Sequence, residues 1–138
     1  MDDNLNPKIV DYGFNSLIEN ASIFLKYKNK NAFSSPEILE NSKTIGTGIN
    51  PSADVYSFGI LAWEVYTSTI PFDVGLKKII ELVVKENYRP EISKMFNQEI
   101  SNLIRMCWES DSTLRPSFKG IVTMLKNISN IYWLIHLS

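Results

Sequence analysis

A stretch of apolar residues from Ala53 to Tyr66 is the strongest pattern in the sequence. Its apolar side chains fall on nearly every side of a helix, and a helix of that kind is buried on all sides. Asn50 can cap the first turn, and Pro51 fits the first helical position. The segment Thr67–Pro71 should end the helix. The pattern therefore predicts one central, buried helix.

Three later segments place apolar residues at the three- and four-residue spacing of an amphipathic helix. They contain Leu76, Ile79, Ile80, Val83 and Val84, then Ile100, Leu103, Ile104, Cys107 and Trp108, and finally Phe118, Ile121, Val122, Leu125 and Ile128. Arg89-Pro90 and Arg115-Pro116 mark the breaks between them, because the residue before a proline disfavours helix. Each helix is expected to lay one apolar stripe against the central helix. Cys107 and Trp108 are accordingly core candidates and not a redox site.

The first third of the chain is less regular. Ile9 and Val10 precede Asp11, Tyr12 and Gly13, which predicts a short strand ending in a turn. The mixed stretch Phe14–Ser35 predicts a long surface loop, of the kind that is usually functional or disordered. From pattern alone, the chain is a mainly helical domain.

Composition narrows the function classes. The 138 residues are 44% hydrophobic and 21% charged, as in a soluble folded protein, and the net charge of -1 favours neither nucleic acid nor an acidic membrane. One Cys and one His make no disulfide and no zinc site, so we expect a reducing, cytoplasmic location. Residues 1–8 lack the pattern of a signal peptide, and no apolar run reaches the ~18 residues that span a bilayer. The tail Ile131–Leu137 is expected to end a core helix rather than to contact a membrane, and His136 is expected to have no role.

Four motifs in order resemble the second half of the eukaryotic protein kinase domain. KIVDYG at 8–13 resembles the D-F-G metal-binding turn, and Ser35-Pro36-Glu37 resembles the A-P-E that closes the activation segment. SADVYSFGILAWEVYTSTIPF at 52–72 is similar to the family's central helix. LIRMCWESDSTLRPSF at 103–118 resembles the C-W…R-P-S-F stretch of tyrosine kinases and the tyrosine-kinase-like group.

The resemblance covers nearly the whole chain and implies its fold. We expect a mainly α fold, a partial protein-kinase C-terminal lobe with a short strand, an activation segment and four to five helices around a central buried helix. Residues 1–130 would form the partial kinase domain, and residues 131–138 a C-terminal tail.

The resemblance also implies roles for single residues. Asp11 would hold Mg²⁺ against the phosphates of ATP, with Gly13 in the same cofactor-binding turn. Glu37 and Arg115 would form the family's buried ion pair, which ties the activation segment to the helical lobe. Asp54 would lie in the first turn of the central helix and reach the catalytic loop. Without the resemblance, these residues are a turn aspartate, two exposed charges and a helix-end acid.

Hydroxyl side chains of the activation-segment region are candidate phosphorylation sites, namely Ser16, Ser22, Tyr27 and Ser34. A phosphate there could order the loop on nearby cations, while loop hydroxyls without a role are the simpler interpretation. The family often has a Thr shortly before the Pro-Glu pair, but Lys30 lies nearest to that place here. Substrate recognition is therefore open, as is the choice between Ser/Thr and Tyr.

The parts of a kinase that do the chemistry are missing from these residues. No G-x-G-x-x-G loop and no H-R-D loop occurs, so no catalytic residue is assigned. Because positioning and charge stabilisation supply nearly all of the catalysis, we expect this chain alone to bind no ATP or Mg²⁺ and to be inactive. Central-helix faces that other kinase helices normally cover would be exposed, which predicts poor solubility or a molten state.

Three functions remain at this point. The first is a kinase C-terminal lobe, from a truncated gene, gene model or pseudogene, whose longer relatives phosphorylate protein substrates. The second is a non-catalytic, kinase-derived module that docks a protein partner through the region Leu76–Asn87. The third, a plain helical scaffold unrelated to kinases, is disfavoured by the four ordered motifs. None of the three involves nucleic acid or a membrane.

Overall fold

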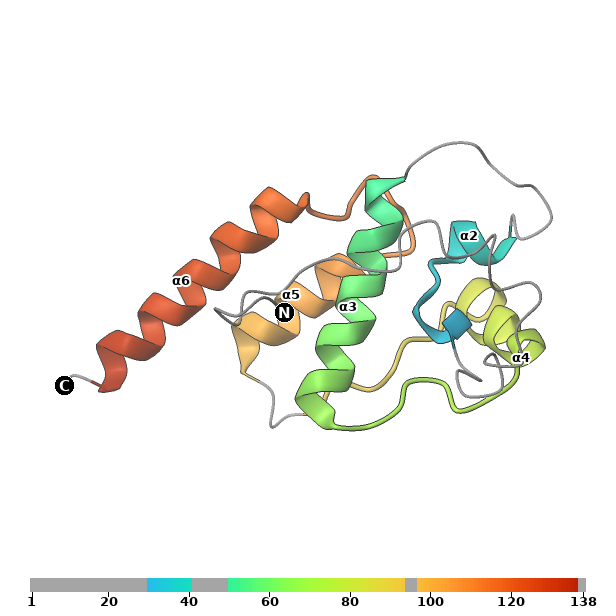
Figure 1. The fold of residues 1–138 in the computed structure, drawn as a ribbon, viewed down its shortest axis with the longest axis horizontal. Coiled ribbons are helices and arrows are strands. Elements are labelled where there is room, and N and C mark those ends of the chain that lie inside the picture. The colour runs from blue at the N-terminus through green and yellow to red at the C-terminus, as the bar shows by residue number, and fades with distance from the viewer. Residues whose placement is uncertain (1–29, 41–49, 94–96, 137–138) are drawn as a thin grey trace, which may run out of the picture.

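The structure is a computed structural model that describes residues 30–40, 50–93 and 97–136, and within these ranges it is helical without β-strands (Figure 1). The elements in chain order are the 3-10 helix η2 (Lys30–Phe33), α2 (Pro36–Glu40), α3 (Pro51–Thr67), α4 (Leu76–Ile80), the π-helical turn η3 (Glu81–Lys85), α5 (Gln98–Cys107) and α6 (Phe118–His136). The mainly helical fold class is therefore confirmed. The predicted strand at residues 9–10 lies outside the described residues.

Helix α3 begins and ends where the sequence predicts. The Asn50 side chain accepts a hydrogen bond from the Ser52 amide at 3.1 Å, and Pro51 occupies the first turn. At the other end, Ser68 adopts a left-handed conformation with φ 53°, and its amide donates to the Glu64 carbonyl oxygen. This end satisfies one of the carbonyl groups that a helix terminus leaves unpaired.

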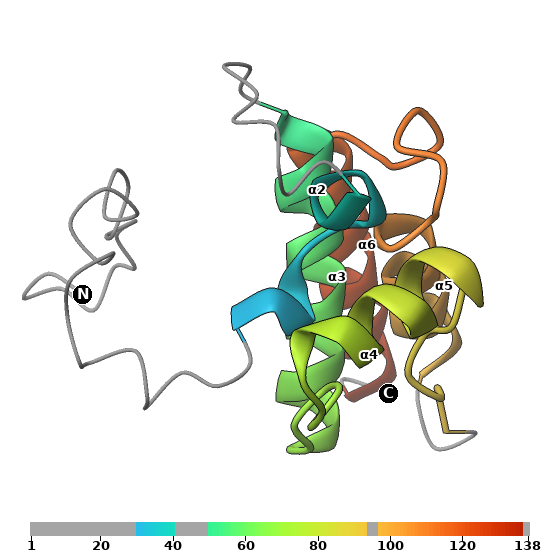
Figure 2. The same cartoon turned by 90° about the vertical axis from the view of Figure 1, so that its right-hand side faces the viewer.

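Helix α3 stands at the centre of the described fold. In Figure 1, α5 and α6 lie on one side of it, and α2 and α4 lie on the other. Figure 2 brings α2 and α4 to the front of α3, with α6 behind it. The placement of α3 between other helices agrees with its predicted central position.

Two apolar clusters hold these helices together. The larger joins α3 to α4, η3 and α5 and includes Tyr56, Ile60, Trp63, Ile79, Val83, Ile104 and Trp108. The smaller joins α3 to α5 and α6 through Val55, Leu103, Cys107 and Ile121. Each amphipathic segment thus contributes buried apolar side chains to a core built on α3.

The prediction that α3 is buried on all sides is wrong. Leu61, Val65 and Tyr66 are 48%, 73% and 49% exposed. They lie on α3 away from the two clusters, which cover only part of its circumference. The exposed apolar side chains agree with the expectation that some faces of this helix lack cover.

The predicted stripe of α6 is also only partly buried. Ile121 and Ile128 are buried, while Phe118, Val122 and Leu125 are exposed. Helix α6 continues without a break to His136. Side chains from residue 130 onward lie outside the described residues, as does any role of His136, and the proposed division at residue 130 stays a prediction.

Two short elements differ from the sequence prediction. The expected loop Phe14–Ser35 ends in the helical turn η2, while residues 14–29 lie outside the described part. The expected single helix after Leu76 changes from α to π geometry at Glu81. No helix in the described ranges is both long enough and apolar enough to cross a membrane.

Candidate functional site

The Arg115 guanidinium, in the loop between α5 and α6, joins three parts of the chain, namely α2, α3 and its own loop. Its Nη1 donates to Glu37 Oε1 at 2.7 Å and to the Ser52 carbonyl at 2.9 Å. Its Nη2 donates to Glu37 Oε2 at 2.9 Å and to the Ser110 carbonyl at 3.2 Å, and its Nε donates to the Glu109 carbonyl at 2.8 Å. All five N–H groups of the guanidinium therefore have acceptors.

The ion pair between Glu37 and Arg115 is bidentate and largely removed from solvent. The Arg115 side chain is 0% exposed and that of Glu37 is 26% exposed. Burial raises the pKa of the Glu37 carboxyl, but hydrogen bonding and charge attraction from Arg115 outweigh it, so the net pKa is lowered from 4.5. The structure thus brings together two of the predicted site residues, from α2 and from the loop before α6.

A second arginine shares this centre, through the ring of Tyr56. The guanidinium carbons of Arg89 and Arg115 lie 5.1 Å and 5.2 Å from the ring centroid, within cation–π range. Tyr56 is fully buried, and burial raises its pKa to about 12. Its hydroxyl group has no hydrogen-bond partner within the described part of the chain.

Arg89 also ties the segment after η3 to the end of α5. It donates to the carbonyl oxygens of Trp108 at 2.9 Å and Tyr88 at 2.8 Å, and to Ser110 Oγ at 2.9 Å. The sequence marked Arg89 only as a helix break before Pro90. Trp108 and Ser110 lie 19 and 21 positions further along the chain, so no local sequence pattern could have revealed these two contacts.

Asp54 lies exposed in the first turn of α3. It lines a hollow of about 340 Å³ that Ser34, Ser35 and Ser57 also line. Ser57 Oγ donates to the Phe33 carbonyl at 2.8 Å, which fixes the end of η2 against α3. The hollow therefore brings together two predicted residues, Asp54 and Ser34.

The remaining predicted site residues lie outside the described part of the chain, namely Asp11, Gly13, Ser16, Ser22 and Tyr27. Within the described ranges, no three His, Cys, Asp or Glu side chains lie close enough together to hold a metal ion. The described residues therefore do not fit a magnesium centre by themselves, and any such centre would need residues outside these ranges.

Cys107 is a core residue, as the sequence predicts. It is 0% exposed, and burial raises the pKa of its thiol to about 12. A thiol with so high a pKa is protonated and unreactive at neutral pH. Trp108, which follows it, is 6% exposed and also belongs to the core.

Comparison with known proteins agrees with this architecture. The sequence profile of protein tyrosine and serine/threonine kinases matches residues 1–125. The chain is 33% identical over 130 residues to the probable serine/threonine-protein kinase roco8 of Dictyostelium discoideum, covering 91% of this chain and 7% of that protein. It is 32% identical over 133 residues to the dual specificity protein kinase shkC of the same organism, covering 93% of this chain and 25% of that protein.

A viral relative extends the same similarity. The putative serine/threonine-protein kinase/receptor R826 of Acanthamoeba polyphaga mimivirus is 33% identical over 125 residues, which cover 91% of this chain and 7% of that protein. The chain thus spans a quarter or less of each of these relatives. The profile match covers most of its residues, and the chain therefore belongs to the protein tyrosine and serine/threonine kinase family.

Proposed function

We propose that this chain is part of the C-terminal, helical lobe of an ATP-dependent protein kinase, in the tyrosine-kinase or tyrosine-kinase-like group. The full catalytic unit would transfer the γ-phosphate of ATP to hydroxyl groups of a protein substrate in the cytoplasm. The observation that carries this proposal is the bidentate Glu37–Arg115 pair, which links the A-P-E-like and R-P-S-F-like motifs across 78 positions. Membership of the kinase family supports it.

Within this proposal, each motif has a separate task. The turn with Asp11 and Gly13 binds Mg²⁺ and the ATP phosphates when both are present. The pair between Glu37 and Arg115 anchors the activation segment on the lobe. Asp54, whose carboxylate lies exposed at the start of α3, supports the catalytic loop.

These 138 residues are inactive by themselves under this proposal. They contain neither a G-x-G-x-x-G loop nor an H-R-D loop, so nothing in them clamps the nucleotide or positions the acceptor hydroxyl. Phosphorylation of Ser16, Ser22, Tyr27 or Ser34 would act on the activation segment by adding a charge that nearby cations can bind.

A non-catalytic docking module is the second candidate function. It is favoured by exposed side chains in and after α4, where Leu76 is 44% exposed and Lys77 and Lys78 are also exposed. Lys78 pairs with Glu81 and Glu86, so this surface combines apolar and charged side chains of both signs, which suits a protein partner. In this case the kinase-derived fold would serve binding alone.

Sequencing of the DNA upstream of Met1 separates the two candidates. An in-frame Gly-rich loop, strand Lys and H-R-D motif would support the enzyme, whereas a stop codon followed by a promoter would support the module. For the enzyme, the longer protein should transfer ³²P from labelled ATP to a protein substrate. Asp11→Asn should abolish the transfer, while Lys126→Gln on the exposed face of α6 should not.

The isolated 138 residues provide the complementary test. Calorimetric titration with Mg-ATP at millimolar concentration should give no measurable heat of binding. Saturable binding or phosphate transfer by these residues alone would contradict the proposed inactivity.

A further inference from the structure

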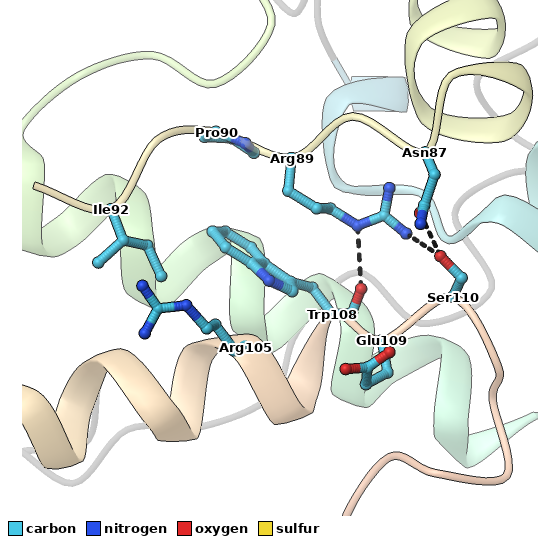
Figure 3. Close-up of a pocket in the computed structure, with 8 residues that line it drawn as sticks. All are labelled: Asn87, Arg89, Pro90, Ile92, Arg105, Trp108, Glu109 and Ser110. Atoms are coloured by element: carbon cyan, nitrogen blue, oxygen red, sulfur yellow. Dashed lines mark hydrogen bonds between the residues drawn. The ribbon is translucent and has the colours of Figure 1, made fainter.

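A cavity of about 300 Å³ lies between the end of α5 and the segment that follows η3 (Figure 3). Part of its lining belongs to the kinase-like motif at 103–118, but none of the roles described above for the kinase motifs uses this cavity. The residues that matter for its chemistry are Arg89, Pro90, Ile92, Arg105, Trp108 and Glu109. In Figure 3 the Trp108 indole lies between the side chains of Arg89 and Arg105.

The cavity has hydrogen-bond donors that the protein does not use. Within the described ranges, no hydrogen bond or ion pair engages the Arg105 guanidinium or the indole N–H of Trp108. Arg89, in contrast, donates hydrogen bonds to four acceptors within the protein. These are the carbonyl oxygens of Val83, Tyr88 and Trp108 and the Oγ of Ser110. Unused donors on a concave surface favour a ligand that supplies acceptor oxygens.

The charges of the lining limit the charge of the ligand. Arg89 and Arg105 contribute two positive charges and Glu109 one negative charge, so the net charge is 2 − 1 = +1. The Glu109 carboxylate also attracts the Arg89 guanidinium. A single negative charge balances this lining, whereas a phosphomonoester, with about −1.5 to −2 charges, exceeds it.

Apolar side chains form part of the cavity surface, beside the polar side chains of Asn87 and Ser110. Pro90 is buried, Ile92 is partly buried, and the ring of Trp108 is 6% exposed. These side chains can cover an apolar group while a guanidinium holds an attached carboxylate, and arginine suits planar carboxylates because its donors form a fork.

The wall behind Trp108 is held in place by several bonds. Ser110 Oγ accepts from Arg89 and donates to the Asn87 side-chain oxygen, and the Ser110 carbonyl accepts from Arg115. A cavity fixed in this way loses little conformational entropy when a ligand binds.

We propose that this cavity binds a monocarboxylate carried on an apolar group, with Arg105 and the Trp108 N–H holding the carboxylate and Ile92 and Pro90 covering the apolar group. The carboxylate belongs either to a small aryl or alkyl acid or to an acidic side chain beside an apolar residue in a protein segment. This proposal does not depend on phosphate transfer.

Titration of the ¹⁵N-labelled 138-residue chain with 3-phenylpropionate tests the proposal. The Trp108 indole N–H resonance should shift in a saturable manner, and the neutral 3-phenylpropionamide should leave it unchanged. Equal shifts with the acid and the amide would overturn the carboxylate assignment, and so would tighter binding of phenyl phosphate. An unchanged Trp108 resonance would overturn the site.

Charge variants sharpen this test. Arg105→Gln should raise the Kd at least tenfold, and Glu109→Gln should lower it at least threefold. Lys126→Gln, an exposed change of the same charge on α6, should leave the Kd within twofold. A Kd that Arg105→Gln does not change would contradict the proposal.

A comparison of two peptides with the free acid identifies the source of the carboxylate. A blocked peptide with Glu-Phe is compared with its Gln-Phe counterpart and with free 3-phenylpropionate. Tighter binding of the Glu-Phe peptide than of the free acid points to a protein segment, and the reverse order points to a small acid. Equal binding of the two peptides, without binding of the free acid, would overturn the proposal.

Discussion

The Arg115 side chain exchanges its hydration for five hydrogen bonds, two of them to one carboxylate. Desolvating a charge is expensive, and attraction repays it only where the geometry is good and the remaining donors are satisfied. Here both conditions hold. Glu37 keeps some contact with solvent, whereas Arg115 has none. Removal of either residue therefore leaves the charge of the other poorly solvated and without its partner.

The first prediction concerns this pair. Glu37→Ala and Arg115→Ala should each lower the free energy of unfolding by about 3–5 kcal/mol, because each leaves a poorly solvated charge without its partner. The double variant should cost little more than either single variant. Urea unfolding followed by tryptophan fluorescence measures all three differences.

The half-exposed pair of Lys78 and Glu81, with a separation of 2.9 Å, supplies the control. Lys78→Ala should hardly change the free energy of unfolding, because both charges stay solvated. Additive effects of Glu37→Ala and Arg115→Ala, each no larger than this control, would contradict a coupled pair.

The second prediction concerns pH. The pKa of Glu37 is lowered from 4.5 in the folded protein, so its ionised form stabilises the fold above about pH 4.5, and this contribution disappears as the pH falls through the lower, folded pKa. Glu37→Gln lacks this contribution. The difference in unfolding free energy between the two proteins should therefore be full at pH 7 and shrink below about pH 4.5. A difference that stays constant down to pH 3 would contradict it.

At the scale of elements, the contact between α3 and α5 depends on a residue without a side chain. A Cβ atom placed on Gly59 would lie 2.8 Å from Cys107 Cβ and 3.3 Å from the Trp108 amide nitrogen. Real Cβ atoms essentially never approach another atom to less than 3.0 Å, and the 3.3 Å approach to the backbone nitrogen is tighter than most real Cβ contacts. Gly59 is therefore needed for the close approach of the two helices.

The third prediction follows from this approach. Gly59→Ala should destabilise the protein by about 1–3 kcal/mol through overpacking, reduced by the better helix propensity of alanine, which is worth about 0.5–1 kcal/mol. Gly120→Ala in α6 is the matched control, because its nearest atom lies 3.6 Å from the new Cβ. The control should be neutral or slightly stabilising in the same urea titration. Equal effects at the two glycines would rule out the overpacking.

The sequence predicted those elements whose causes are local. The cap at Asn50 and the apolar spacing of α5 need only neighbouring residues, and both are as expected. The short helix α2 escaped prediction because five residues carry too little periodicity.

Other features of the candidate site depend on contacts between distant segments. The anchoring of Arg89 on Ser110 and the approach of Gly59 to Cys107 have no local sign in the sequence. The Glu37–Arg115 pair could be anticipated only through the resemblance to kinases, since 78 positions separate the two residues. The prediction that α3 is buried on all sides failed at Leu61 and Val65 for a different reason. An apolar side chain shows that burial would be favourable, but it does not show that another element is present to cover it.

At the scale of the whole molecule, the described fold exposes apolar side chains on its central helix. Leu61 and Val65 lie one turn apart and therefore share one face of α3. Further apolar side chains are exposed on α6. Surfaces of this kind favour association.

The fourth prediction is that the isolated chain self-associates. Sedimentation velocity should show a weight-average mass that rises with concentration, and Val65→Glu should reduce that rise because it places a charge on the exposed face. Asn127→Glu, an exposed polar position on α6, adds the same charge away from α3 and should have less effect. A monomer mass that stays constant over the whole concentration range would contradict this prediction.

The separation of Glu37 and Arg115 along the chain has a consequence for folding kinetics. Closing a loop of 78 residues has a length-dependent entropic cost of about 4 kcal/mol, so this pair should form late, after the helices between its ends have docked. Weakening a contact that is absent from the transition state accelerates unfolding and leaves the folding rate nearly unchanged. In stopped-flow experiments, Glu37→Ala should therefore act almost entirely on the unfolding limb of the chevron plot. The ion pair would then slow the unfolding of the completed fold without guiding its formation.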